Sequence, residues 1–518
     1  MIEPRKAAEM PATEGAALPS SNDDVQPPNS TVRPAILRLP RELRDLIYEH
    51  YIRIGGGYTY DYASNKLREA DGRPISIALT ASCRQIASEL RGLPFSYNTI
   101  TFSTYFSKST NKDADVFHST VESISLAKRG LIRHLIPLLL TEDMAQEASQ
   151  AFPQFEQIFD EWEPGRSIDA LRNWDFTGGE ARSVWEDFKQ LILTLLSRHP
   201  KFLQVLETLS DLHTRRKGCK IPGLRNACLE PWSIPDIVEM ERLADIVNVE
   251  PERPDYWSST RYCFSAVHAA LRFLQSIPAT TCEMIRKVIL LEDRPSVAYP
   301  QCHGRGLIPF CQTHKELCFE RIVDLWRKAF PVSTRAMYDY IRKSQNGDDA
   351  NTMSEDRLIS GTISDAIGSW MTEAQALQDL GMPEGSHTLV FNGASNPEQA
   401  SRAFQVVQRD AAWQVALDVA YKRGTLPHHS WSERRLRTGY ITECFPDVVA
   451  NLSKKDAPIR CNFSLGTPYS AKKLGQDHRG WDNDDWVSRW NSYEQAKFQT
   501  EPPLPPWHIL RWGYVLTR

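Results

Sequence analysis

The chain has 518 residues, more than the ~250 to 300 at which a single hydrophobic core stops growing, so we expect two or three packed units. Its composition, 41% hydrophobic and 24% charged, is that of a folded globular protein and excludes a wholly disordered chain. With 61 Lys plus Arg against 65 Asp plus Glu, the net charge of -4 offers no basic field for nonspecific binding of nucleic acid or an anionic membrane.

Cysteine content and hydropathy indicate the compartment. Ten cysteines in 518 residues are too sparse for a disulfide scaffold and indicate reduced, mostly buried thiols. The chain contains no run of about 18 apolar residues, and residues 1–21 lack the continuous apolar segment of a signal peptide. We therefore expect an intracellular protein, cytoplasmic or nuclear, that binds neither membrane nor nucleic acid.

The first organised segment follows a leader without periodicity. Residues 1–34 are rich in Pro, Ser and Asn, which predicts disorder. The sequence LRLPRELRDLIYEHYI then predicts an amphipathic helix, because Leu39, Leu43 and Ile47 recur every four residues on one face. Pro40 suits the first turn of this helix, where a missing N–H costs no hydrogen bond.

Three further elements are expected before residue 105. Residues 55–74 begin with three glycines and are interpreted as an exposed connection. Residues 75–93 predict a second helix with a narrow apolar stripe that includes Cys83 and Ile86. Residues 98–102, NTITF, predict a strand.

From residue 106 onward helical patterns dominate. Amphipathic patterns predict helices at residues 184–209, with a break at Pro200, and at residues 263–278, 317–330 and 398–424. Short apolar runs at residues 131–143, 284–293 and 387–391 favour strands. The first two runs share their residue order, which indicates helix-then-strand units and a small, partly parallel, buried sheet.

The predicted fold is therefore mainly α with minor β. A helical N-terminal module at residues 35–105 would precede a larger helical body at residues 106–518 that contains the small sheet. A leucine-rich-repeat-like arrangement is an alternative for this body, and a division into two subdomains would fall near residues 345–385.

The densest group of metal-ligand residue types is the segment CHGRGLIPFCQTHKELC. Its residues Cys302, Cys311, His314 and Cys318 offer thiolate and imidazole groups, which are the ligands of tetrahedral zinc. The favoured interpretation is buried free thiols, with zinc as the alternative, because the paired CxxC spacing of a zinc knuckle is absent. Cys302 or Cys311 could also pair with His303, His314, His428 or His429 as nucleophile and base, although the spacing specifies no pair and we assign no catalytic residue.

Other charged clusters are interpreted as solvated surface. Asp482, Asp484 and Asp485 could hold a divalent cation but suit an exposed acidic loop better. The basic runs at residues 215–217 and 434–437 are interpreted in the same way. The Gly-rich segments lack the preceding strand and following helix of a phosphate-binding loop, so zinc is the one cofactor that the sequence suggests.

The segments LPRELRDLIYEHYI, LTASCRQIASEL and YNTITF together resemble the F-box-like N-terminus of a family of filamentous-fungal proteins. The resemblance covers residues 37–102. It implies a small helical module that docks on the Skp-type adaptor of cullin-RING ubiquitin ligases, while a C-terminal domain holds a protein substrate. The family's docking positions are matched by Leu39, Pro40, Leu43, Ile47 and Cys83. Ile86 fills the space in which the family usually has a Trp that this chain lacks.

Three functional hypotheses follow. The favoured one is a non-enzymatic, F-box-like interaction protein, although the face of Leu39, Leu43 and Ile47 would equally suit packing within the chain, because docking and core stripes share one periodicity. The second is an enzyme of unrecognised class, or a zinc-binding protein, that uses residues 302–318. The third is a structural scaffold with no link to a ligase.

Overall fold

The computed structural model describes residues 34–513 except 164, 167, 169–170, 172–176, 213–219, 250–260, 332–357, 455–456 and 491–496. The predicted leader, residues 1–34, lies outside the described residues but for Pro34, and so do residues 345–357 of the range 345–385 in which a subdomain boundary was expected. Contacts within the chain separate Met1–Tyr51 from Ile52–Arg518, and the two units are treated separately below. Among the described helices, none is both long and apolar enough to cross a bilayer.

The N-terminal unit consists of a short 3-10 helix and the start of a longer helix. The 3-10 helix η1 spans Ala35–Arg38, and α1 spans Arg41–Ile52, as the amphipathic pattern predicted. Pro40 precedes the first turn of α1, and its carbonyl accepts a hydrogen bond from the Arg44 N–H at 3.2 Å. Glu42 lies in that first turn, where the positive end of the helix favours a carboxylate.

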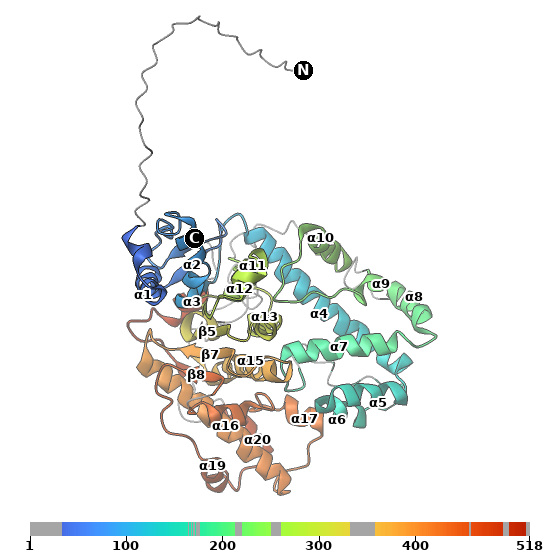
Figure 1. Ribbon diagram of the computed structural model, residues 1–518. Helices are drawn as coiled ribbons and strands as arrows, with labels where there is room; N and C mark the ends of the chain where they lie inside the picture. Colours follow the sequence, from blue (N-terminus) through green and yellow to red (C-terminus); the bar gives the residue numbers. More distant parts are fainter. Residues whose placement is uncertain are drawn as a thin grey trace, which may run out of the picture. The chain divides into compact units, whose positions relative to one another are not determined.

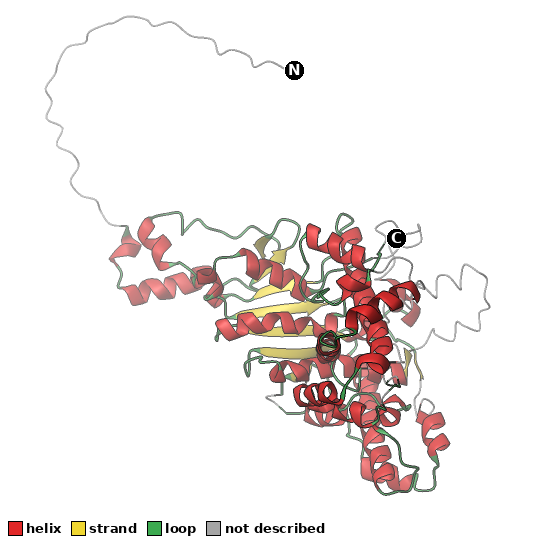
Figure 2. Cartoon of the chain, turned by 90° about the vertical axis from the view of Figure 1, so that its right-hand side faces the viewer, coloured by secondary structure: helices red, strands yellow, loops and turns green. Residues whose placement is uncertain are grey.

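The larger unit contains a seven-stranded sheet in the order β2-β1-β3-β4-β5-β7-β8 (Figure 2). All neighbours are parallel except the edge pair β1 and β2. The predicted class, mainly α with a partly parallel sheet, is thereby confirmed. The strands are β1 (Tyr58–Asp61), β2 (Lys66–Glu69), β3 (Ile100–Ser103), β4 (Lys287–Glu292), β5 (Cys318–Asp324), β7 (His387–Asn392) and β8 (Ile459–Cys461).

This sheet crosses the boundary expected near residue 105. β3 pairs with β4, with Ile100 opposite Val288, so strands from the segment 35–105 join strands from the body. The exposed connection predicted at residues 55–74 is wrong, because most of it forms the hairpin of β1 and β2. The intervals of sequence between successive strands are unequal, whereas a leucine-rich repeat needs a constant period.

Helices surround the sheet and extend away from it (Figure 1). Those before β4 are α2 (Arg84–Glu89), α3 (Leu93–Tyr97), α4 (Asn111–Leu139), α5 (Glu142–Ala151), η2 (Pro153–Phe155), α6 (Glu156–Asp160), α7 (Arg182–Leu196), α8 (Phe202–Leu212), α9 (Ile221–Leu224), α10 (Ile237–Ile246), α11 (Ala266–Ser276) and α12 (Ala279–Cys282). Those after β4 are η5 (Pro300–Leu307), α13 (Ile308–Thr313), η6 (Leu325–Ala329), α15 (Ser360–Asp379), α16 (Pro397–Lys422), α17 (Trp431–Leu436), α18 (Phe445–Asn451), α19 (Ala471–Asp477), α20 (Asn483–Trp490) and α21 (Trp507–Gly513). A second, two-stranded sheet joins β6 (Leu358–Ile359) to β9 (Lys497–Phe498).

Four of the predicted helices are confirmed by α7, α8, α11 and α16, and the strands predicted around β3, β4 and β7 are also present. The second predicted helix is shorter than expected, since only α2 forms within residues 75–93 before α3 begins.

The strand predicted at residues 131–143 is wrong, because most of this run belongs to α4. Its apolar residues Leu131, Leu135 and Leu139 are buried at intervals of four, which suits a helix face. Pro137 lies within the last turn, where it forfeits one backbone hydrogen bond without ending the helix early. Periodicity over such a short apolar run does not distinguish a buried strand from a buried helix.

The helix predicted at residues 317–330 is also wrong. Residues 318–324 form β5, and a single turn of π-helix, η6, follows. Phe319, Arg321 and Val323 are buried in alternation, which is the two-residue period of a strand. The Arg321 side chain is only 2% exposed.

Arg321 is buried because β4 supplies a partner. Its Nη2 and Nε donate to Glu292 Oε1 at 2.7 and 3.1 Å, and the Glu292 side chain is fully buried. Nη2 also donates to the Pro300 carbonyl at 2.6 Å, Nη1 donates to the Gln301 carbonyl at 3.2 Å, and the guanidinium lies 4.7 Å from the ring centroid of Trp370. One side chain thus joins two strands to η5 and α15.

We expect Arg321→Met to lower the free energy of unfolding by about 3 to 5 kcal/mol, because Glu292 would keep a buried charge without its closest partner. Adding Glu292→Met should recover most of this loss, since both charges are then removed. Chemical denaturation measures both effects. The control is Arg286→Met, which breaks the surface pair of Arg286 with Glu316 and should cost under about 1 kcal/mol. An equal loss of unfolding free energy in Arg321→Met and Arg286→Met would contradict this account of the sheet.

Candidate functional site

The first candidate site is an apolar stripe on α1. Leu43, Leu46, Ile47 and Tyr51 are 47, 57, 40 and 43% exposed, and we call these four residues the docking face. Leu46 and Ile47 lie three and four residues after Leu43, and Tyr51 lies four residues after Ile47, which places all four on one side of the helix. An amphipathic helix ordinarily buries such a stripe, so four large apolar side chains in solvent constitute a surface suited to a partner.

The turn before α1 is held in place locally. Arg44 Nη1 donates to the Leu39 carbonyl at 2.6 Å, and the Leu39 N–H donates to the Ile36 carbonyl at 3.3 Å. Arg41 and Asp45 form an ion pair at 2.7 Å one turn apart on the helix. The Leu39–Pro40 corner, predicted to contact an adaptor, is therefore an ordered entry to the helix that carries Leu43 and Ile47.

The two later docking candidates lie on α2. The Cys83 sulfur caps this helix by accepting the Ile86 N–H at 3.5 Å, and Cys83 is partly exposed. The Ile86 side chain is 3% exposed. Ile86 thus presents no surface to a partner, in contrast to Leu43 and Ile47.

The predicted zinc ligands occupy different elements. Cys302 is buried in η5 and Cys311 is buried in α13, while His314 follows α13 and the exposed Cys318 begins β5. Over the described parts of residues 34–513, no group of three or more His, Cys, Asp or Glu side chains is placed to hold a metal ion.

His303, one of the two histidines of this segment, belongs to a closed polar network. His303 Nε2 lies 2.7 Å from the Ala298 carbonyl, and its Nδ1 lies 2.8 Å from Ser265 Oγ. His268 Nδ1 lies 3.2 Å from the same Ser265 oxygen. Burial lowers the pKa of His303 well below its ordinary value and that of His268 to about 4, so both rings are neutral near pH 7.

Cys302 does not act as the partner of His303. Its thiol donates to the Tyr299 carbonyl at 3.0 Å. Burial raises the pKa of this thiol well above the ordinary value, which keeps it protonated. Cys302 and His303 are therefore not assembled as nucleophile and base.

The two charged clusters near the C-terminus have structural partners. Asp482 accepts the Asp485 N–H at 2.8 Å, which places the acidic cluster at the start of α20. Arg434 forms paired hydrogen bonds with Asp418 and Glu443. The basic run at residues 215–217 lies outside the described residues.

The second candidate site is a cavity of about 880 Å³ in the larger unit. Its volume lies within the ~300 to 1,000 Å³ of typical small-molecule sites. It is bounded by α4, by α7 and the loop before it, by η5, by α15, and by α17 with the loop that follows it. Its charged lining residues are Glu122, Arg129, Glu180, Arg182, Glu186, Lys189, Asp365, Glu373, Arg435 and Arg437.

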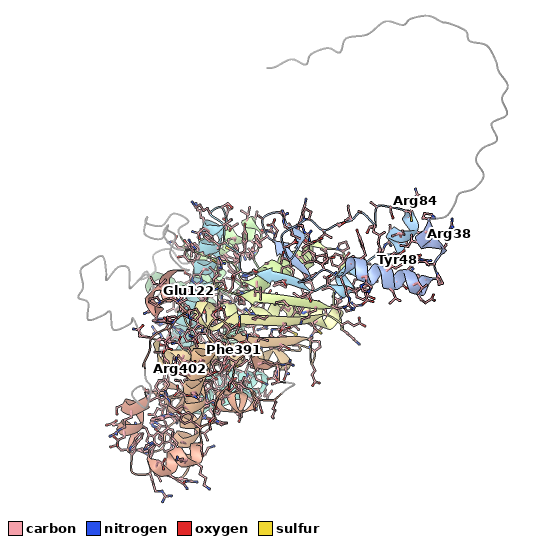
Figure 3. The ribbon with its side chains drawn as sticks, turned by 90° about the vertical axis from the view of Figure 1, so that its left-hand side faces the viewer. Arg38, Tyr48, Arg84, Glu122, Phe391 and Arg402 are labelled. Carbon is pink, nitrogen blue, oxygen red and sulfur yellow. The ribbon has the colours of Figure 1, made fainter. Side chains whose placement is uncertain are left out.

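Two adjacent helices, α4 and α7, supply one wall (Figure 1). Glu122, Ser125 and Arg129 follow one another at intervals of three and four residues on α4, as do Arg182, Glu186 and Lys189 on α7, so each set lies on one helix face. Figure 3 labels Glu122, the first of these residues along the chain. We call these six residues the α4–α7 wall.

A lysine lies at the centre of the α4–α7 wall. Lys189 Nζ donates to Glu186 Oε1 at 2.7 Å, to Ser125 Oγ at 3.0 Å and to the Ser125 carbonyl at 3.3 Å, while Ser125 Oγ donates to Glu186 Oε1 at 2.6 Å. Burial lowers the pKa of Lys189 to about 8, against the opposing effect of Glu186, and repulsion from Arg182 and Arg129 adds to the decrease. The pKa of Glu186 is lowered, because Lys189 and Ser125 outweigh the effect of burial.

The first turn of α7 is anchored by α15. Glu373 Oε1 accepts the Ser183 N–H at 3.0 Å, and its Oε2 accepts the Ser183 hydroxyl at 2.7 Å. This carboxylate thereby satisfies an N–H that the helix itself leaves without a partner. The contact sets where Arg182 and Glu186 stand on the cavity wall.

Two other carboxyl groups of the cavity have raised pKa values. Burial raises the pKa of Glu180 to about 7, with Arg435 opposing and Glu443 adding to the increase. Burial and the neighbouring Asp410 raise the pKa of Asp365 to about 6, although its side chain still reaches the solvent of the cavity. Near neutral pH both groups exchange protons readily, so they can donate or accept hydrogen bonds.

Comparison with protein-family models, with curated proteins and with solved structures finds no match for this chain.

The cavity was not predicted from the sequence, although a signal was present. Ser125, Arg129 and Lys189 interrupt otherwise apolar helix faces and are all buried. Isolated polar residues of this kind are ordinarily interpreted as solvent-facing, because their partners are distant in sequence.

We expect the Glu180 carboxyl to make stability fall as pH rises. Its folded pKa of about 7 exceeds the ordinary 4.5, so between these values the folded state binds more protons than the unfolded state, and ionisation then costs free energy. Relative to Glu180→Gln, the wild-type free energy of unfolding should fall between about pH 5 and pH 8 by up to about 3 kcal/mol. Urea denaturation across this range measures the difference. The exposed Glu207 provides the control Glu207→Gln, and parallel pH profiles for wild type and Glu180→Gln would contradict the prediction.

Proposed function

We propose that this chain is an F-box-like interaction protein whose α1 helix docks on the Skp-type adaptor of a cullin-RING ubiquitin ligase. The body after α1 would hold a protein substrate. The observation that carries the proposal is the exposure of the docking face, Leu43, Leu46, Ile47 and Tyr51. Many proteins bind a partner's helix in a hydrophobic groove, and the bound helix inserts one exposed apolar stripe into that groove.

The energetics favour docking through α1. Burying a large aliphatic side chain contributes about 1.5 to 3 kcal/mol, so even partly buried side chains at four positions could sustain micromolar binding after the costs of association. The ordered Leu39–Pro40 corner would lower part of that cost, because the entry to the helix is already fixed by Arg44. Since Ile86 is buried, the proposed contact rests on α1 and not on α2.

The enzyme and zinc hypotheses based on residues 302–318 receive less support from the geometry. Cys302 is a protonated, buried thiol, and the other candidate ligands lie on separate elements. The remaining hypothesis, a scaffold without a ligase link, predicts that no adaptor binds the docking face.

We expect the double substitution of Leu43→Asp with Ile47→Asp to weaken binding of the purified adaptor at least ~100-fold, because two carboxylates would have to enter an apolar groove. The free energy of unfolding of this variant should differ from that of wild type by no more than about 0.5 kcal/mol, since both side chains are exposed. Affinity is measured by calorimetry or surface plasmon resonance on the full chain, and stability by denaturation.

Leu203 offers a matched control. It lies on α8 and is 71% exposed, so Leu203→Asp introduces one such carboxylate, half the charge of the double variant, on a helix outside the docking face. Its adaptor affinity should equal that of wild type. The proposal is rejected if the folded wild-type protein does not bind the adaptor. It is also rejected if Leu203→Asp loses as much adaptor affinity as the double variant does.

A further inference from the structure

Three cations gather on the α4–α7 wall. Arg129 comes from α4, whereas Arg182 and Lys189 come from α7, and all three line the cavity. Burial lowers the pKa of Lys189, and repulsion from the guanidinium groups of Arg182 and Arg129 adds to the decrease. The wall also carries two acids, Glu122 and Glu186, of which Glu186 pairs directly with Lys189.

Crowded cations at a concave wall favour an anion. Like charges in partly desolvated surroundings repel one another strongly, and a bound oxyanion converts that repulsion into attraction. Arg182 is also positioned by an aromatic ring, since its guanidinium carbon lies 4.0 Å from the ring centroid of Tyr299. Stacking of this kind restricts the side chain and so lowers the entropy lost when it binds.

We propose that the cavity binds a small, hydroxylated organic molecule through one oxyanion group, a carboxylate or a phosphate, held at Arg129 and Arg182, with the charge of Lys189 beside them. This site is separate from the proposed adaptor-binding function, because it uses none of the docking-face residues.

The remaining walls suit the neutral part of such a ligand. Glu180 and Asp365 can each donate or accept a hydrogen bond near neutral pH, which matches hydroxyl groups. Tyr440 also lines the cavity. Its hydroxyl group donates to Glu443 Oε2 at 2.8 Å, which fixes the ring, and the ring presents a rigid aromatic surface. The volume of about 880 Å³ accommodates a molecule of the size of a phosphorylated sugar.

The test compares three probes on the full-length chain: glucose, gluconate and glucose 6-phosphate. They share a six-carbon polyol framework and differ in the presence and type of oxyanion. We expect at least one anionic probe to bind in calorimetry with a dissociation constant at least tenfold below that of glucose. The stronger of the two anionic probes identifies the oxyanion as carboxylate or phosphate.

Substitutions locate the binding. Arg182→Gln should weaken binding of the anionic probe at least tenfold, since a charge-assisted hydrogen bond contributes about 1.5 to 3 kcal/mol. The affinity for glucose should not change. The control Arg198→Gln removes an exposed arginine just beyond the end of α7 that pairs with Glu147, and should bind the probe as wild type does.

Proton uptake provides a readout independent of affinity. An anion beside Lys189 raises its pKa from about 8, so binding at pH 8 should take up a fraction of a proton, measured by calorimetry in buffers of different ionisation enthalpy. Lys189→Met should reduce this uptake to the share contributed by Glu180. The proposal is overturned if the three probes bind equally or not at all, or if Arg182→Gln and Arg198→Gln behave alike.

Discussion

The ion pair of Arg321 with Glu292 is the interaction on which the larger unit depends. A buried guanidinium is tolerated because every direction in which it donates meets an acceptor, from Glu292 on β4 to the carbonyls of Pro300 and Gln301 in η5. Lys328 lies 3.7 Å from the second oxygen of Glu292 and adds to its neutralisation. One group of charges thus holds together strands β4 and β5 of the sheet and η5, which lines the cavity.

α15 transmits this constraint to the helices. Trp370 lies beside Arg321, and Glu373, one turn further along, caps α7 through Ser183. Asp365 and Thr372 on the same helix line the cavity. The position of Lys189 on the α4–α7 wall therefore follows from contacts that begin in the sheet, which explains how residues distant in sequence form one polar site.

The chain combines two surfaces of different chemistry. The docking face of α1 is apolar and exposed, and its shape is determined within a few helical turns. The cavity is polar and concave, and it requires five separate segments of the larger unit. A protein that recruits a partner through one surface and binds a small molecule at another could couple the two only through a conformational change, because coupling needs a state that both ligands bias.

The sequence by itself determined the elements whose pattern is local. The spacing of Leu43 and Ile47 predicted α1 and its apolar face, and the longer patterns predicted α7, α11 and α16, because 3.6-residue periodicity over several turns is specific to a helix. Only the tertiary structure decided β5 and the cavity. Arg321 lies in a segment that was predicted to be helical, and its burial in β5 depends on a carboxylate 29 positions earlier in the chain. Lys189 likewise depends on Ser125 from another helix, and no local pattern encodes a partner that folding alone brings into contact.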